Sequence, residues 1–124
     1  MDFQLKYADE LNKLKENENN TEFFRKLASG RDNPEAMKEI IDELLEFSKE
    51  NNLNNVRGWA YYYLGWYNFD KTHYDKAVEC FLVSNDIFDV VKNKDGLIYA
   101  CNGLTNVYCQ IGQFKLANEW GLKG

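Results

Sequence analysis

The sequence has a single histidine, His73, and this scarcity limits the chemistry that the chain can perform. Ser/His/Asp and Cys/His catalytic groups need a histidine beside a nucleophile, and a histidine-based metal site needs several. Glycine-rich phosphate loops and the HExxH metal motif are absent as well. The many Asp and Glu residues fall on the polar sides of amphipathic patterns, where solvation accounts for them. We therefore expect no catalytic residues, no metal and no cofactor in this chain, and His73 to lie exposed in a turn.

The sequence also lacks paired cysteines and long apolar runs, and both absences favour a cytoplasmic location. Cys80, Cys101 and Cys109 are odd in number, lie within apolar helical patterns and lack CxxC spacing, which favours buried free thiols in a reducing environment. The N-terminal residues do not form a basic segment followed by an apolar one, as a secretory signal would. No apolar run approaches the roughly 18 residues of a membrane helix. The prediction is a cytoplasmic protein without a membrane partner.

Basic charge is in deficit, which excludes another class of partner. Fifteen Lys and Arg residues stand against 20 Asp and Glu residues, giving a net charge of −5, and no basic patch interrupts this excess. Proteins that follow a phosphate backbone or an anionic membrane need the opposite balance. We expect no nucleic acid to bind.

With 124 residues, the chain is long enough for one domain with a continuous core and no covalent staple.

Apolar residues recur at helical spacing along the whole chain, and no strand-like alternation competes with them. The only proline, Pro34, follows Asn33, a pair that predicts a capping side chain and a helix start. The segment 56–69 is apolar nearly all round, so we expect it to be contacted on more than one side. The pattern predicts an all-α fold of about seven helices, near residues 3–16, 21–30, 34–50, 56–69, 74–91, 96–110 and 113–124.

A forty-residue echo organises these helices. The earlier copy has Leu64, Ala77, Glu79 and Leu82, and the later copy has Leu104, Ala117, Glu119 and Leu122. Such periods indicate units that bury their apolar faces only by stacking on neighbouring copies.

The echo resembles the tetratricopeptide repeat, a helix-turn-helix unit of usually 34 residues. The family's small and aromatic positions are filled by Leu64–Gly65, Tyr74, Ala77 and Phe81, and then by Leu104, Tyr108, Gly112, Phe114 and Ala117. Departures are the longer spacing, Thr105 in place of the expected glycine and Thr72 where the later copy has Gly112. The longer spacing is similar to that in bacterial signalling proteins, including peptide-pheromone receptors and regions preceding sensor kinase or diguanylate cyclase domains.

The resemblance implies stacked antiparallel helical hairpins, a TPR-like α-solenoid. It divides the chain as one helical-repeat domain, 1–124. Within that domain, residues 1–33 are weakly matched N-terminal helices, 34–55 a degenerate half repeat, 56–95 a repeat, and 96–124 a repeat that looks truncated.

In such stacks the first helix of each hairpin lines a concave groove, and its residues at i, i+3, i+7 and i+10 face that groove. The predicted peptide-binding or partner-binding residues are Trp59, Tyr62, Trp66, Phe69, Tyr99, Asn102 and Asn106. Aromatic rings supply contact area at low entropic cost, and Asn pairs with both the N–H and the C=O of a peptide. Two alternatives remain open: the aromatic stripe packs inside the protein or against a partner subunit, and the asparagines are ordinary surface residues.

The last helix carries Phe114, Leu116 and Trp120, which we expect to form an exposed apolar edge suited to self-association. The leading hypothesis is a non-catalytic module that binds a protein or peptide, as the N-terminal part of a bacterial signalling or regulatory protein. The alternative is a sensory or dimerisation segment of a larger enzyme, such as a diguanylate cyclase or sensor kinase, with catalysis beyond residue 124.

Overall fold

The computed structural model describes residues 7–17 and 33–123, which form six helices and no strand. In chain order the helices are α2 (Ala8–Glu16), α4 (Pro34–Glu50), α5 (Asn54–Asp70), α6 (Tyr74–Val90), α7 (Lys94–Gln110) and α8 (Phe114–Lys123). The all-α prediction is confirmed: the described residues form six helices, where about seven are expected for the whole chain. The helix expected at 21–30 lies outside the described residues.

The four helices from α4 to α7 each have 17 residues, and three-residue linkers separate them from each other and from α8. The echo of forty residues is therefore a pair of twenty-residue units, each consisting of one helix and one linker. The middle linker residue always has a positive φ, at Asn52, Thr72, Lys92 and Gly112. The last linker residue donates its N–H to a carbonyl five residues earlier, as in His73 N to Asn68 O at 2.8 Å. This bond closes each helix and turns the chain back, so consecutive helices run antiparallel.

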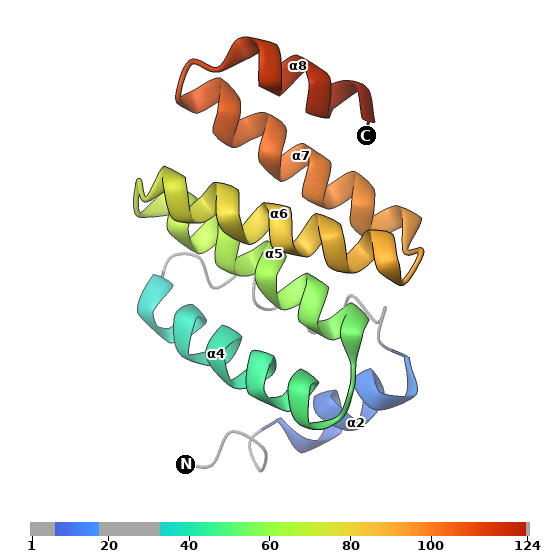
Figure 1. The fold of residues 1–124 in the computed structure, drawn as a ribbon. Helices are drawn as coiled ribbons and strands as arrows, with labels where there is room; N and C mark the ends of the chain where they lie inside the picture. Colours follow the sequence, from blue (N-terminus) through green and yellow to red (C-terminus); the bar gives the residue numbers. More distant parts are fainter. Residues whose placement is uncertain (1–6, 18–32, 124) are drawn as a thin grey trace.

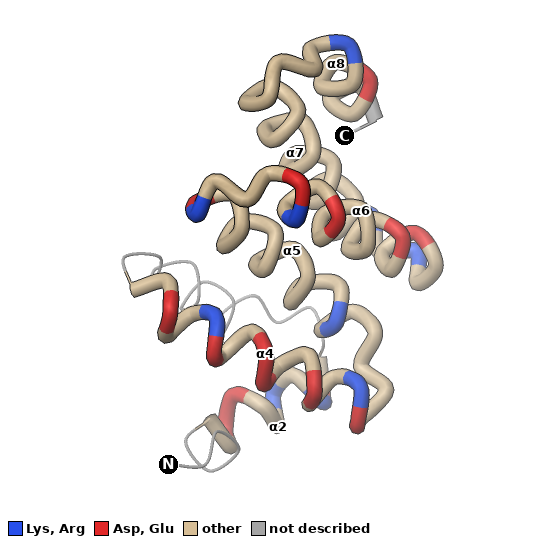
Figure 2. Tube along the Cα trace, turned by 60° about the vertical axis from the view of Figure 1, so that its left-hand side comes forward, with Lys and Arg blue, Asp and Glu red and all other residues tan. Residues whose placement is uncertain are grey.

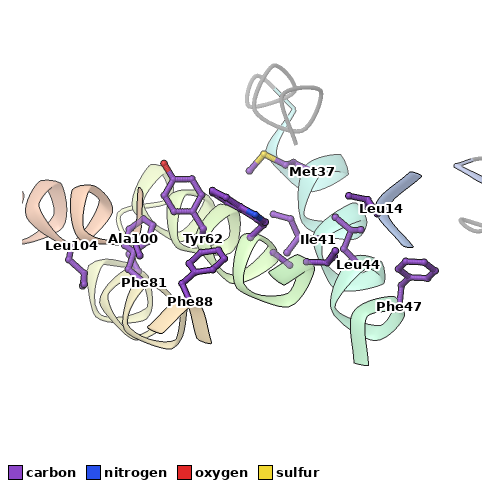
Figure 3. Packing of buried hydrophobic residues seen from close by; sticks show 14 of the residues in the cluster. Leu14, Met37, Ile41, Leu44, Phe47, Tyr62, Phe81, Phe88, Ala100 and Leu104 are labelled. Atoms are coloured by element: carbon purple, nitrogen blue, oxygen red, sulfur yellow. The ribbon is translucent and has the colours of Figure 1, made fainter. Parts of the chain in front are cut away.

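Consecutive helices from α4 to α8 pack against one another, and α5 also contacts α7. Figure 1 shows the resulting stack, with α2 beside α4 at one end and α8 beside α7 at the other. The core runs without a break along the stack, from Leu14 and Leu44 to Tyr62 and Leu104 (Figure 3). This arrangement places α5 and α7, the helices that carry the predicted binding residues, next to each other.

Phe81 and Phe88 of α6 fill the space between α5 and α7, where glycines admit their rings. A Cβ added at Gly65 or at Gly103 would lie 2.6 Å from Phe81 Cε1, so the ring is held between two helix backbones. Phe88 lies in the same way between Gly58 and Gly96. Gly103 therefore meets the Phe81 ring from the side opposite to Gly65. Thr105, which takes the place of Gly65 in the echo, faces Gly121, which takes the place of Phe81.

Among the helices from α4 to α8, three starts differ from the expectation. The helices α5 and α7 begin two residues earlier than predicted, at Asn54 and Lys94, and α8 begins one residue later, at Phe114. Pro34 opens α4 as predicted, but the Asn33 side chain makes no capping hydrogen bond. The capping asparagine is instead Asn93, whose side chain accepts from Gly96 N at 3.0 Å at the start of α7.

Candidate functional site

The helices α5 and α7 are nearly free of charge, in contrast to their neighbours. No charged residue occurs from Gly58 to Phe69 in α5 or after Asp95 in α7, whereas acidic and basic residues follow each other along α4. Figure 2 shows this segregation, with α7 almost wholly uncoloured beyond its first turn. A surface on these two helices therefore presents aromatic and amide groups rather than charged ones.

The first two predicted residues, Trp59 and Tyr62, lie in the core. Their exposed fractions are 4% and 7%. The Trp59 ring lies 4.9 Å from Phe88, and the Tyr62 ring lies 5.8 Å from Phe81, measured between centroids. These two rings therefore support the site from below, as in the alternative that the stripe packs inside the protein, and they offer a ligand almost no surface.

Tyr99 of α7 lies over these two rings and connects the helices. Its ring centroid is 5.4 Å from that of Trp59 and 5.7 Å from that of Tyr62, both edge-on. Yet 49% of Tyr99 is exposed. Aromatic pairs of this geometry stabilise by about 0.5–1.5 kcal/mol each beyond the burial of their area. The two contacts hold the ring in place and leave the rest of it open to a partner.

Asn102 and Asn106 follow Tyr99 on the same face of α7 and are exposed. Asn106 Nδ2 donates to the Asn102 carbonyl oxygen at 2.8 Å and more weakly to Asn102 Oδ1 at 3.5 Å. Among the described residues, Asn102 Nδ2 and Asn106 Oδ1 make no hydrogen bond. The pair thus presents one amide donor and one amide acceptor, which match the C=O and N–H groups of a peptide backbone.

Trp66 and Phe69 continue the aromatic row toward the C-terminal end of α5 and are half-buried. Their rings lie 5.2 Å apart, and each also contacts a ring of α6: Trp66 lies 5.3 Å from Phe81, and Phe69 lies 5.6 Å from Tyr74. Of the seven predicted residues, Tyr99, Asn102 and Asn106 are the exposed ones. Trp66 and Phe69 are partly accessible, and Trp59 and Tyr62 are covered.

The predicted apolar edge on α8 is present in altered form. Phe114 and Leu116 are exposed, but Trp120 is half-buried and packs against the core. Leu122, with 80% of its surface exposed, belongs to the edge instead. The sequence argument missed it because Leu122 matches Leu82 in the echo, which suggested a structural role.

The three cysteines differ from one another in burial. All are free thiols: Cys101 is buried as expected, Cys80 is half-buried, and Cys109 is exposed, contrary to the expectation. Burial raises the pKa of the Cys80 thiol to about 11, with Asn68 acting weakly in the opposite direction. His73 is exposed in the linker before α6, as predicted.

The parts of the chain that the structure describes contain no group of three or more His, Cys, Asp or Glu side chains placed to hold a metal ion. Of the six described helices, none combines the length and apolar character that a membrane crossing requires.

In this arrangement a fixed aromatic ring lies beside two exposed amides, on a helix without charged residues after Asp95. Comparison of the chain with known proteins finds no matching family model, no matching curated protein and no matching solved structure.

Proposed function

We propose that the chain is a non-catalytic interaction module that binds a peptide segment of a partner protein along α7. Tyr99 provides the apolar contact, and Asn102 and Asn106 pair with the backbone of the peptide. Trp59 and Tyr62 hold the Tyr99 ring from below, and Trp66 and Phe69 extend the surface along α5. The resemblance to the long-spaced tetratricopeptide repeats of bacterial signalling proteins supports the same proposal.

The observation that carries the proposal is the state of Tyr99. A large ring that is half exposed and yet fixed by two edge-on contacts loses little freedom when a ligand covers it. Tyrosines of this kind are frequent among the residues that dominate binding energy. The adjacent amide donor and acceptor add the directional contacts that such a ring lacks.

The test begins with selection of binders from a displayed library of random peptides of about twelve residues. A selected peptide is then titrated into the wild type and into variants while tryptophan fluorescence is recorded. We expect Tyr99→Ala to lose about 2 kcal/mol, or roughly thirtyfold in affinity, and Asn106→Ala to lose roughly tenfold. Asn54→Ala is the matched control, because Asn54 is an exposed asparagine in the first turn of α5. A peptide that binds Tyr99→Ala as tightly as the wild type refutes the site.

A second candidate function is a sensory or dimerisation segment of a larger enzyme. The exposed Phe114 and Leu122 on α8 favour it, since they form an apolar edge that association would cover. The two candidate functions use different surfaces. Peptide binding requires an accessible face of α7, and association requires an accessible face of α8.

A further inference from the structure

The helix α8 has an exposed apolar face that borders a groove. Phe114 is 68% exposed, and Leu122 and Gly121 lie on the same side of the helix. Together with Thr105 and Cys109 of α7, these residues line a groove of about 340 Å³. The groove is a surface feature with an apolar lining, so a partner of apolar character fits it.

The packing of α7 on α6 indicates what kind of helix can cover this face of α8. Positions 114, 121 and 122 are forty residues after Tyr74, Phe81 and Leu82 of α6, and Phe81 packs against α7 at Gly103. In α8 the position of Phe81 is taken by Gly121. A Cβ added there would find Thr105 as its nearest neighbour, at 3.8 Å. A helix that packs on α8 as α7 packs on α6 must therefore run antiparallel to it and must bring its own large side chain to the place of the missing ring.

We propose that α8 of a second copy of this chain is that helix. Phe114 and Gly121 are seven residues apart, which is two turns and about 10 Å along one face of a helix. When two α8 helices meet antiparallel about a twofold axis, Phe114 of each copy reaches Gly121 of the other, and both contacts form at once. The same face of α8 thus carries both the large side chain, Phe114, and the open position that receives it, Gly121.

Charge complementarity supports a second copy over an unrelated helix. Lys115 and Glu119 are exposed beside this face and are four residues apart. The antiparallel pairing that joins Phe114 to Gly121 also sets Lys115 of one copy against Glu119 of the other, twice. Asn118 lies near the twofold axis, where an amide pairs with its own kind because it carries both donor and acceptor.

The proposed interface is small. One ten-residue helix from each copy supplies less than the roughly 1,200 Å² that stable complexes bury, so the dimer is weak and depends on concentration. It uses none of the α7 residues assigned to peptide binding, so the two proposals are tested separately.

The test is sedimentation equilibrium of the full chain under reducing conditions, from about 10 µM to about 1 mM. We expect the average mass to rise from 14.6 kDa at the lowest concentration toward twice that value at the highest. Phe114→Asp should weaken the dimer at least tenfold and leave the helical circular dichroism unchanged, because Phe114 contributes little to the core. Val90→Asp is the control, since Val90 is an exposed apolar residue on α6, and it should leave the dimer intact.

The charge pairs allow a sharper test. Lys115→Glu alone should weaken the dimer several-fold at low salt, and adding Glu119→Lys to it should restore the wild-type mass profile. A monomer at 1 mM refutes the proposal and assigns the face to a helix of different origin. A dimer that survives Phe114→Asp, or that the exchanged charges fail to restore, refutes it as well.

Discussion

Replacing Gly103 with alanine should destabilise the protein, although alanine is the better helix former. The substitution gains about 1 kcal/mol of helix propensity. Against this, the new Cβ would lie 2.6, 2.7 and 2.8 Å from three atoms of the Phe81 ring, well inside contact distance. Overpacking of a core costs about 1–3 kcal/mol. We expect the upper end of this range, because Phe81 is fully buried and the backbone at Gly65 prevents its ring from moving away from Gly103. The net loss in the free energy of unfolding is then about 2 kcal/mol.

Urea unfolding followed by circular dichroism measures this loss, and Gly121→Ala is the matched control. Gly121 is also a helical glycine, but its added Cβ would meet only Thr105 at 3.8 Å, an ordinary contact. Measured at low concentration, Gly121→Ala should stabilise the protein by roughly 0.5–1 kcal/mol. Replacing the Phe81 ring with the smaller side chain of leucine should lower the free energy of unfolding less in the Gly103→Ala variant than in the wild type. If Gly103→Ala is as stable as the wild type, Phe81 is not confined between the two helices.

Four further predictions concern one linker, the thiols and the binding face. Thr72→Gly should raise the free energy of unfolding by about 1 kcal/mol in urea denaturation, because the β-branched Thr72 is held at a φ of 62° that glycine adopts freely. With a thiol reagent at pH 8, Cys109 should react fast, and Cys80 and Cys101 slowly, as rates resolved by mass spectrometry would show; fast labelling of Cys80 would contradict its burial. Because the Cys80 pKa rises from 9.0 to about 11 on folding, its contribution to stability is present below pH 9 and lost as the pH approaches 11. The affinity of a selected peptide for the uncharged α7 face should change less than about twofold between low and high salt, and a steep salt dependence would indicate an ionic contact.

The helices could be predicted from the sequence because their apolar residues recur at helical spacing. The backbone conformation and exact length of the linkers could not. Gly112 and, less strongly, Asn52 are of residue types that favour a positive φ, but Thr72 and Lys92 are not. Thr72 and Lys92 adopt that conformation under the constraint of the helices on either side, which no local preference reveals. For this reason neither the regular unit of 17 helical and three linker residues nor the early starts of α5 and α7 can be predicted from the sequence.

The candidate site was predicted in position but not in exposure. The spacing expected for stacked helical hairpins places Trp59, Tyr62 and Tyr99 on one face, and the structure brings their rings together. Which of them remains accessible depends on how α7 lies across α5. A helix that is apolar nearly all round, as α5 is, gives no indication of which side is covered. The position of Gly103 shows the same limit, since its role follows from the path of α7 past Phe81 rather than from its place in the echo.

Chemical-shift mapping shows whether a peptide binds to the face of α7 that carries Tyr99, Asn102 and Asn106. Isotope-labelled protein is titrated with a selected peptide, and the shifts of backbone and asparagine side-chain amides are followed. We expect the largest changes at Tyr99 and at the side-chain amides of Asn102 and Asn106, with smaller changes at Trp66. Changes concentrated on α4 or α8, with those two amides unmoved, would contradict it.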